Sequence, residues 1–340
     1  MIKQYLEKVI EKENLSFDES FTVMNEVMTG TVNNSLLAGF LIALKAKGET
    51  PAEVAGFAKA MRNNCIKIKC DDENAIDVCG TGGDNSGTFN ISTAVAFTAA
   101  GAGVRVAKHG NRSISSKSGS ADVLQNLGVN INLGRDESER ALKEIGIAFL
   151  FAPLYHPAMK YAAPVRKELA MKTVFNMLGP LTNPAGVKKQ LIGTFNRKAA
   201  KTMSEAAKYL DFEKACFICS NDSYDEIYLG DVTEIHEYNN GKEIKSYTIT
   251  NETFDYPAIS DEDIKGDTAE INAQIILDVL DNKTRNGAYH TIAANSALAL
   301  YCAGFSNNLN ECQNAAEDSI LSGAAFSKLN ELRKFSNTAS

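Results

Sequence analysis

Two stretches of this sequence combine glycines with short polar side chains in a way that suits the binding of a phosphorylated ligand. The first is GTGGDNSGTFNIST at residues 80–93, and the second is KHGNRSISSKSGSAD at residues 108–122. Glycines let a backbone turn tightly and approach a ligand without a Cβ in the way. Lys108 and Lys117 can neutralise phosphate charge, and the serines of the second stretch offer hydroxyl groups.

Each of these stretches leads into a predicted helix. Asn90, Ser92 and Thr93 place short polar groups at a helix N-terminus, where unpaired N–H groups and the helix dipole favour an anion. Asp84 would repel a phosphate and suits a ribose hydroxyl, a metal ion or an attacking amine instead. Neither a Walker loop nor the dinucleotide fingerprint is matched, so an ordinary glycine-rich turn is the simpler alternative.

The elements around these stretches predict where they meet. Short strands are expected at 75–78 and 104–107, with a helix at 92–100 between them. Such a βαβ unit pairs its strands in parallel. Both polar stretches would then follow the carboxyl ends of neighbouring strands, the edge at which open α/β sheets bind ligands.

The rest of the chain divides into a helical part and an alternating part. Residues 1–64 show helical spacing only, with helix starts expected after Ser20 and at Pro51, where Thr50 is the N-cap. Further strands are expected at 148–151, 190–194 and 215–219, and an antiparallel excursion at 226–250 with a turn at 239–241. Helices are expected at 120–127, 137–145, 197–210, 268–280, 291–302 and 309–332.

This pattern predicts an α/β fold: a mostly parallel central sheet flanked by helices, with a smaller all-helical domain. We expect the helical domain at residues 1–70, joined by a helical segment near 157–187, and the α/β domain at 71–340. No internal repeat interrupts this organisation.

Composition restricts the classes of function. The chain has 340 residues and a net charge of −7, which argues against a general nucleic-acid surface. Residues 1–12 lack the apolar stretch of a signal peptide, and glycines and polar residues break the apolar window 91–104, so we expect a cytoplasmic protein without a membrane span. The seven cysteines are expected to be reduced, and Cys216 and Cys219 to lie in a buried strand rather than in a zinc site.

The two polar stretches resemble those of the anthranilate phosphoribosyltransferase family. The similarity continues through HPAM at 156–159, PVR at 164–166 and FNMLGPLTNP at 175–184, and it covers nearly the whole chain. It implies transfer of ribose 5-phosphate from phosphoribosyl pyrophosphate to the amino group of anthranilate, a step toward tryptophan. It also implies the two-domain architecture that this family shares with nucleoside phosphorylases, and a homodimer formed through the helical domain.

The resemblance assigns ligands to individual residues. Arg166 matches the arginine that binds the anthranilate carboxylate, which a guanidinium can grip with two hydrogen bonds. The other residues implied for anthranilate are Gly80, Gly82, His109 and Asn111. The residues expected at phosphoribosyl pyrophosphate are Gly80, Gly82, Gly83, Asp84, Thr88, Asn90, Ile91, Ser92, Thr93, Lys108, Ser116 and Ser120.

A metal site is expected as well. Pyrophosphate leaving groups travel with Mg²⁺, which takes carboxylate and phosphate oxygens. Asp225 and Glu226 follow the predicted strand 215–219 and match the family's acidic pair, and Ser92 resembles an additional ligand, so two Mg²⁺ ions are expected. The chain departs from the family before this pair, where residues 220–224 read SNDSY instead of the usual His-Gly-x-Asp-Gly. Asn85, Ala170 and Lys172 are smaller departures.

Other functions stay open at this point. A pyrimidine nucleoside phosphorylase shares the architecture and acts at the same sugar carbon, but it lacks KHGNR and the acidic pair. A non-catalytic relative that binds nucleic acid is disfavoured by the intact residues 108–112, by Arg166 and by the acidic net charge. His109 could act as a general base, or it could only shape the pocket. The remaining three histidines are expected to be structural.

Overall fold

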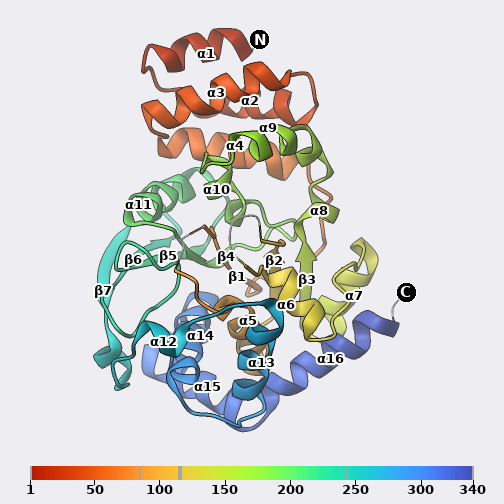
Figure 1. The fold of residues 1–340 in the computed structure, drawn as a ribbon, viewed down its shortest axis with the longest axis vertical. Helices are drawn as coiled ribbons and strands as arrows, with labels where there is room; N and C mark the ends of the chain where they lie inside the picture. The colour runs from red at the N-terminus through yellow and green to blue at the C-terminus, as the bar shows by residue number, and fades with distance from the viewer. Residues whose placement is uncertain (1, 84–85, 114–116, 242, 339–340) are drawn as a thin grey trace.

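The computed structural model describes residues 2–83, 86–113, 117–241 and 243–338. The N-terminal part is a bundle of helices at the top of Figure 1. Segments from the middle of the chain pack against this bundle, α9 on α3 and α10 on α4. The helices concerned are α1 (Ile2–Ile10), α2 (Phe17–Met28), α3 (Asn34–Lys47), α4 (Pro51–Asn63), α9 (Ala163–Leu169) and α10 (Phe175–Leu178).

Side-chain caps decide where two of these helices begin. Thr50 caps α4 and Glu53 bonds back to it, which confirms the expected N-cap. The predicted start of α2 after Ser20 was wrong, because Ser16 and Glu19 form a capping box one turn earlier. Buried Glu53 also accepts a hydrogen bond from the main chain of Leu15 at 2.9 Å, and this contact ties α4 to the loop before α2.

The second part of the molecule contains a seven-stranded sheet in the described residues, with strand order β3-β2-β1-β4-β5-β6-β7. The first five strands are parallel, and the last two pair antiparallel as predicted. The sheet therefore has a topological switch point between β1 and β4, where the strand order reverses. The strands are β1 (Ile76–Gly80), β2 (Val106–Gly110), β3 (Ile147–Phe151), β4 (Lys189–Gly193), β5 (Lys214–Ser220), β6 (Thr233–Asn239) and β7 (Lys245–Ile249).

Both faces of the sheet are covered. In β5, Cys216 and Ile218 join the core formed with α5 and α14, whereas Phe217 and Cys219 join the core formed with α4 and α11. This alternation is the period of two of a strand buried on both sides. The reading of these two cysteines as part of a buried strand is confirmed, and all seven cysteines are free thiols.

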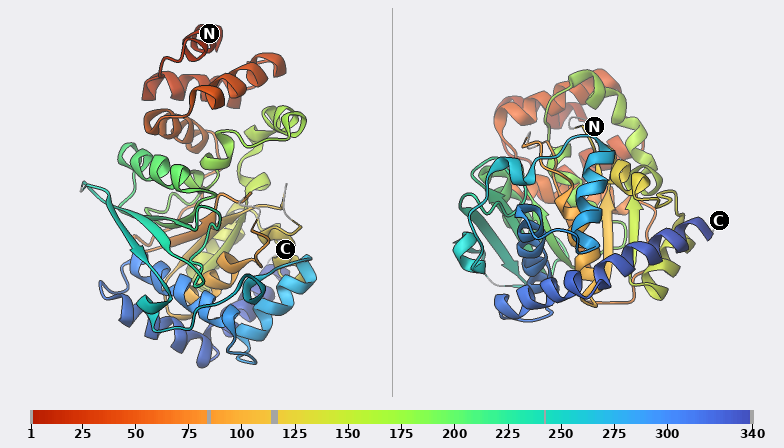
Figure 2. Two further views of the ribbon diagram at one scale, coloured as in Figure 1. Left: turned by 60° about the vertical axis from the view of Figure 1, so that its left-hand side comes forward. Right: turned by 60° about the horizontal axis from the view of Figure 1, so that its bottom comes forward.

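Figure 2 shows the C-terminal helices in blue on the side of the sheet away from the N-terminal bundle. The remaining α-helices are α5 (Ile91–Gly101), α6 (Ser120–Asn126), α7 (Arg135–Glu144), α8 (Ala152–Tyr155), α11 (Arg197–Ala206), α12 (Asp261–Ile264), α13 (Ala269–Leu280), α14 (Gly287–Ala303), α15 (Leu309–Leu321) and α16 (Ala324–Thr338). Short 3-10 segments are η1 (Pro157–Tyr161), η2 (Pro180–Thr182), η3 (Ala207–Tyr209) and η4 (Asn251–Phe254).

The structure corrects several predicted boundaries. The single final helix expected at 309–332 is two helices, because Gly323 adopts a φ of +78° between α15 and α16. The helix expected from residue 291 already begins at Gly287, after the N-cap Asn286. β2 extends to Gly110, so Lys108 and His109 lie within the strand rather than in the loop after it.

Within residues 2–83, 86–113, 117–241 and 243–338, every helix is too short or too polar to cross a lipid bilayer.

Candidate active site

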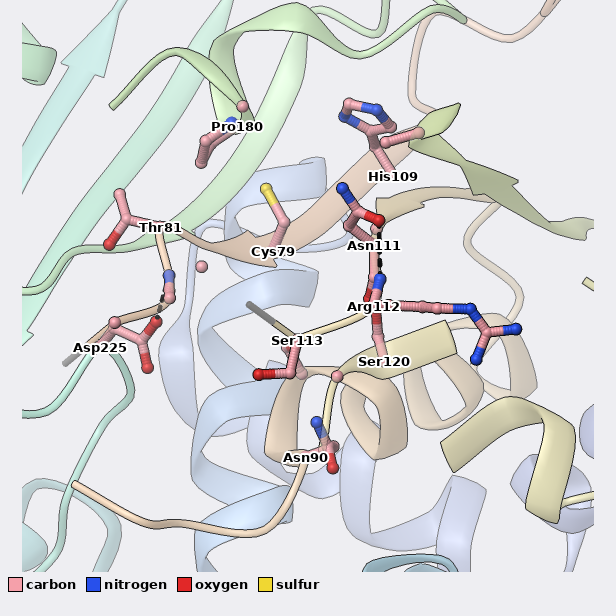
Figure 3. Close-up of a pocket in the computed structure, with 18 of the residues that line it drawn as sticks. Cys79, Thr81, Asn90, His109, Asn111, Arg112, Ser113, Ser120, Pro180 and Asp225 are labelled. Atoms are coloured by element: carbon pink, nitrogen blue, oxygen red, sulfur yellow. Dashed lines mark hydrogen bonds between the residues drawn. The ribbon is translucent and has the colours of Figure 1, made fainter. Parts of the chain in front are cut away.

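A cavity of about 320 Å³ opens at the carboxyl ends of β1 and β2, beside the switch point between β1 and β4. Figure 3 shows Thr81 and Asp225 on one side of it, His109 and Asn111 on another, and Asn90 below them. The walls come from both parts of the molecule, because α9 and α10 contribute residues opposite the strand ends. This is the crevice in which doubly wound sheets place their ligands.

The first polar stretch leaves β1 and crosses to the neighbouring strand. Thr81 donates its main-chain N–H to the carbonyl of Gly193 at 2.9 Å, and its hydroxyl accepts from the N–H of Phe195 at 3.0 Å. The chain then turns at Gly82, whose φ of +62° is a left-handed conformation that side chains disfavour. The loop is thereby anchored to β4 before it reaches α5.

Lys108 places its positive charge at the bottom of the cavity. Its side chain is buried, and Nζ donates to the carbonyl of Val78 at 2.6 Å and to Oγ of Ser92 at 3.1 Å. Burial lowers the pKa of Lys108, while the carboxylate of Asp77 opposes that shift. A poorly solvated ammonium of this kind attracts an anion more strongly than an exposed lysine does.

The acidic pair, Asp225 and Glu226, follows β5 and lies across the cavity from this lysine. Asp225 Oδ2 accepts a hydrogen bond from the N–H of Gly82 at 3.2 Å, and Glu226 Oε1 accepts one from the N–H of Ser92 at 3.2 Å. A Cβ at Gly80 or Gly193 would collide with Asp225, so glycines at these two strand ends make room for the pair. The structure therefore brings together the metal residues expected from the sequence.

Two buried contacts hold the main chain around the acidic pair. Ser220 Oγ donates to the carbonyl of Glu226 at 2.5 Å. Asn295 of α14 accepts from the N–H of Ile227 at 2.9 Å and donates to its carbonyl at 3.1 Å. The altered turn before the pair has its own function, since Asp222 accepts the first N–H of α11 from Arg197 at 2.7 Å. Asn221 and Asp222 both have positive φ values, 49° and 50°.

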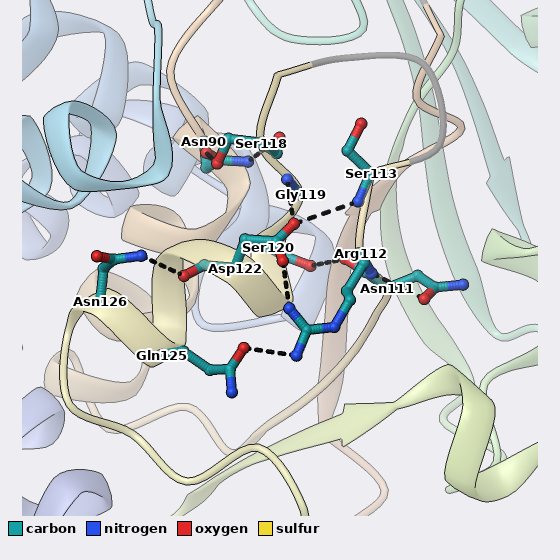
Figure 4. Close-up of polar contacts among 10 residues, drawn as sticks. All are labelled: Asn90, Asn111, Arg112, Ser113, Ser118, Gly119, Ser120, Asp122, Gln125 and Asn126. Atoms are coloured by element: carbon teal, nitrogen blue, oxygen red, sulfur yellow. Dashed lines mark hydrogen bonds and ion pairs between the residues drawn. The ribbon is translucent and has the colours of Figure 1, made fainter.

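The second polar stretch is organised by Asp122 of α6 (Figure 4). Its Oδ2 accepts from the N–H of Gly119 at 3.0 Å and from that of Ser113 at 3.4 Å, and its Oδ1 forms an ion pair with Arg112. A Cβ at Gly119 would collide with the main chain of residues 111–113. Ser113 and Gly119 are therefore held against the start of α6, and Ser118 and Ser120 line the cavity.

The helical part supplies the cation and the ring that face this loop. The Arg166 guanidinium lies 5.2 Å from the ring centroid of Phe175, and burial lowers its pKa. Asn176 and Pro180 continue this wall. An arginine beside an aromatic ring and next to a proline suits a planar ligand that carries a carboxylate.

His109 and His156 form a buried pair with ring centroids 5.1 Å apart. Burial, together with a smaller contribution from the neighbouring His156, lowers the pKa of His109 to about 3. Burial also lowers the pKa of His156 to about 4. Both imidazoles are therefore neutral at physiological pH, and His109 lines the cavity as an uncharged ring.

Most of the residues expected from the sequence meet in this cavity. Ile91 and Thr93 do not line it, because their side chains are buried in the core beneath α5. Asp84, Ser116 and Asn85 lie outside the described residues. The expected residues that line the cavity are Gly80, Gly82, Gly83, Thr88, Asn90, Ser92, Lys108, His109, Asn111, Ser120, Arg166, Asp225 and Glu226.

Sequence reasoning missed other lining residues. Phe175, Asn176 and Pro180 belong to the FNMLGPLTNP motif, which supported the resemblance but received no role in binding. Cys79 precedes the first polar stretch and Phe89 lies within it, both as ordinary apolar positions, so no signal in the sequence distinguished them. Asp122 was visible at the end of the second stretch, but its function of holding the loop needed the fold.

Comparison with known proteins agrees with this geometry. Two family models match, described as the glycosyl transferase family helical bundle domain at residues 3–65 and the a/b domain at residues 72–326. The anthranilate phosphoribosyltransferase of Alkaliphilus metalliredigens is 44% identical over 99% of this chain and 98% of its own. That of Petrotoga mobilis is 46% identical over 99% and 97%.

Solved structures show the same similarity. The anthranilate phosphoribosyltransferase of Thermus thermophilus is 36% identical and superposes with a TM-score of 0.92. The match covers 98% of this chain and 99% of the Thermus thermophilus chain. The Saccharomyces cerevisiae enzyme in complex with PRPP and Mg shares the fold, with a TM-score of 0.90 at 24% identity over 99% and 98%. The mostly parallel α/β fold with a helical bundle is thus confirmed, and the chain belongs to the anthranilate phosphoribosyltransferase family.

Proposed function

We propose that this chain transfers the 5-phosphoribosyl group of phosphoribosyl pyrophosphate to the amino group of anthranilate and releases pyrophosphate. The observation that carries this proposal is the composition of one cavity. It joins Lys108, the glycine-rich turn and an acidic pair from the sheet with Arg166 from the helical part. The sheet side of the cavity suits a donor that carries phosphates, and the Arg166 side suits an acceptor that carries a carboxylate.

The reaction forms one bond and breaks one. The amine nitrogen of anthranilate bonds to C1 of the ribose, the bond from C1 to the pyrophosphate oxygen breaks with its electrons going to the leaving group, and the nitrogen loses a proton. The buried ammonium of Lys108 lies where it can offset negative charge on the donor. Positioning two substrates in one cavity supplies much of the remaining acceleration.

On the acceptor side, Arg166 would bind the carboxylate of anthranilate. The ring of Phe175 lies against the guanidinium. Asn111 and neutral His109 would complete the surroundings of the anthranilate ring. With a pKa of about 3, His109 accepts a proton poorly at neutral pH, which supports a role in shaping the pocket.

Magnesium fits the donor set on the sheet side. Asp225 and Glu226 offer the hard oxygen ligands that Mg²⁺ prefers, and Mg²⁺ commonly takes one or two carboxylates together with substrate phosphates. In the part of the chain that the structure describes, no group of three or more acidic, histidine or cysteine side chains surrounds a common point. We propose that one ion is held by the acidic pair and a second by Ser92 and the donor. When bound, Mg²⁺ neutralises pyrophosphate charge.

The fluorescence of anthranilate provides the test. We expect the signal to fall only when protein, phosphoribosyl pyrophosphate and Mg²⁺ are all present, with one pyrophosphate released for each anthranilate consumed. Omitting each component in turn is the control. Phosphorolysis of thymidine without loss of anthranilate would contradict the proposal and favour a nucleoside phosphorylase.

We further propose the division into a helical domain at residues 1–70, joined by the segment near 157–187, and an α/β domain at 71–340. A homodimer through the helical domain is part of this proposal, supported by the exposure of Ile10 (58%) and Ile42 (41%) on α1 and α3. Light scattering should then give twice the mass of one chain. Ile42→Lys should lower that mass, and Lys12→Ala, at an exposed position after the end of α1, should leave it unchanged.

A further inference from the structure

A segment far along the chain lies against the first polar stretch. The N–H of Phe89 donates to the carbonyl of Ile264 at 3.0 Å, and the N–H of Gly266 donates to the carbonyl of Gly87 at 2.7 Å. Thr88 and Lys265 form an antiparallel bridge between these bonds. The beginning of α13 is thereby held next to the N-terminus of α5.

One side chain of α13 points from this segment to the cavity wall. Asn272 is 2% exposed, and its Nδ2 donates to Oδ1 of Asn90 at 3.0 Å. Its own Oδ1 accepts from the main-chain N–H of Asp267 at 2.8 Å. Asn90 lines the cavity, whereas Asn272 does not. Sequence reasoning gave Asn272 no role.

The contacts fix which end of each amide points where. A main-chain N–H can only donate, so the end of Asn272 that faces Asp267 must be oxygen and the end that faces Asn90 must be nitrogen. The atom of Asn90 that receives this bond is then its oxygen. At the other end, Asn90 Nδ2 donates to the main-chain carbonyl of Ser118 at 3.3 Å, and Ser118 Oγ donates to Asn90 Oδ1 at 3.4 Å. Figure 4 shows Asn90 and Ser118 side by side.

We infer that Asn272 is a positioning residue for the phosphorylated donor: it holds the amide of Asn90 so that Nδ2, and not Oδ1, faces the anion. An amide nitrogen carries two N–H groups, and the Ser118 carbonyl takes one of them. The second can donate to a phosphate oxygen, whereas an inverted amide would present an oxygen and repel it. This inference rests on the proposed function, because it needs an anionic donor in the cavity.

The test reverses the direction of the chain of hydrogen bonds. In Asn272→Asp the side chain keeps its size and still accepts from the N–H of Asp267, but it can no longer donate to Asn90 Oδ1. The Asn90 amide should invert. We expect the KM for phosphoribosyl pyrophosphate to rise at least tenfold, with the KM for anthranilate changed less than twofold. Asn272→Ala should give a smaller rise, because it removes the donor without adding an acceptor.

A double-mutant cycle separates orientation from the added negative charge. In the Asn90→Ala background there is no amide to invert, so Asn272→Asp should change the KM for the donor less than twofold further. Gln274→Glu also replaces an amide by a carboxylate, but at an exposed position of α13, and it should leave the KM for the donor unchanged. An equal effect of Asn272→Asp in both backgrounds, or on both substrates, would overturn the inference. If the wild type consumes no anthranilate, the proposed function fails instead. Calorimetric titration of Mg·phosphoribosyl pyrophosphate gives the same comparison without turnover.

Discussion

At the scale of single residues, two buried histidines meet beside the cavity. His109 and His156 have ring centroids 5.1 Å apart, and burial lowers both pKa values, to about 3 and about 4. Nε2 of each ring is buried without a hydrogen-bond partner in the described residues. Such a pair stays neutral, and His109, which lines the cavity, presents an uncharged ring there.

These pKa values predict how stability depends on pH. In the unfolded chain His109 takes up a proton below its ordinary pKa of 6.5, but in the folded chain it stays neutral until about pH 3. Acid therefore favours the unfolded state, and stability should fall as the pH drops from about 6.5 toward 3. Melting temperatures between pH 7 and 4.5 test this. His109→Gln should show a smaller decrease than the wild type, and equal slopes would contradict the assignment.

Arg166 gives a second prediction at this scale. Removing it should weaken the binding of the acceptor far more than that of the donor, because a hydrogen bond between charged groups contributes about 1.5–3 kcal/mol. In Arg166→Ala we therefore expect the KM for anthranilate to rise roughly 10- to 100-fold. The KM for phosphoribosyl pyrophosphate should change little. Lys167→Ala, on the exposed side of α9, is the matched control. Equal effects on both substrates would remove this role.

At the scale of elements, the ends of β1 and β4 pack directly against the turn that carries the acidic pair. β1 and β4 end in Gly80 and Gly193, and the acidic turn after β5 lies directly against both. Side chains at the strand ends would displace Asp225 and, with it, the bond from the N–H of Gly82. The glycines and the acidic pair are therefore one structural unit, although they are separated widely in the sequence.

Gly193→Ala tests this unit. The new Cβ would overlap the carbonyl of Asp225, so the turn must move. We expect a loss of stability of about 1–3 kcal/mol, typical of overpacking, and weaker binding of Mg²⁺ in a calorimetric titration. The control is Gly39→Ala in α3, where the nearest atom to the new Cβ is 3.8 Å away and alanine is the better helix former. Unchanged melting of Gly193→Ala would show that the turn has room to adjust.

At the scale of the whole molecule, one buried carboxylate connects the sheet to the segment that returns from the helical part. Asp77 Oδ2 accepts from Asn183 Nδ2 at 2.8 Å and from Gln190 Nε2 at 3.1 Å, and Oδ1 accepts from the N–H of His109 at 3.0 Å. Burial raises the pKa of Asp77, and the hydrogen bonds from Asn183 and from the N–H of His109 oppose this shift. Nearby, Arg62 of α4 donates to the carbonyl of Leu181 at 2.6 Å.

Asp77→Ala should therefore affect both stability and the site. It leaves three N–H donors without their acceptor in the interior, each costing about 1–3 kcal/mol, so we expect a loss of roughly 3–9 kcal/mol. Because β2 also carries Lys108, weaker donor binding should accompany the loss. Denaturant unfolding and donor titration measure the two effects. Asp71→Ala, at a side chain that is 77% exposed, is the control, and a loss no larger than that of the control would contradict this role.

Much of the site could be predicted because its chemistry is local. A run of glycines, hydroxyls and a lysine at a strand end shows in the sequence which ligand class it suits, and helix periodicity and caps such as Thr50 need only neighbouring residues. The ends of helices were harder to predict where a contact between two elements, and not a local cap, decides them. The break at Gly323 separates two helices that pack on α5 and α14, and the apolar spacing continues across it.

By itself, the sequence predicted the fold class and two stretches suited to a phosphorylated ligand, because both depend on residue types at short spacing. The roles expected for the acidic pair and for Arg166 came from the resemblance to the family. Only the tertiary structure decided how they meet. Strand order places β1 beside β4, which brings residues near 80 and 225 into contact, and Asn272 reaches Asn90 across 182 positions. The physical reason is that hydrogen bonds and packing between distant segments depend on the three-dimensional path of the chain. The spacing of neighbouring residues does not specify that path.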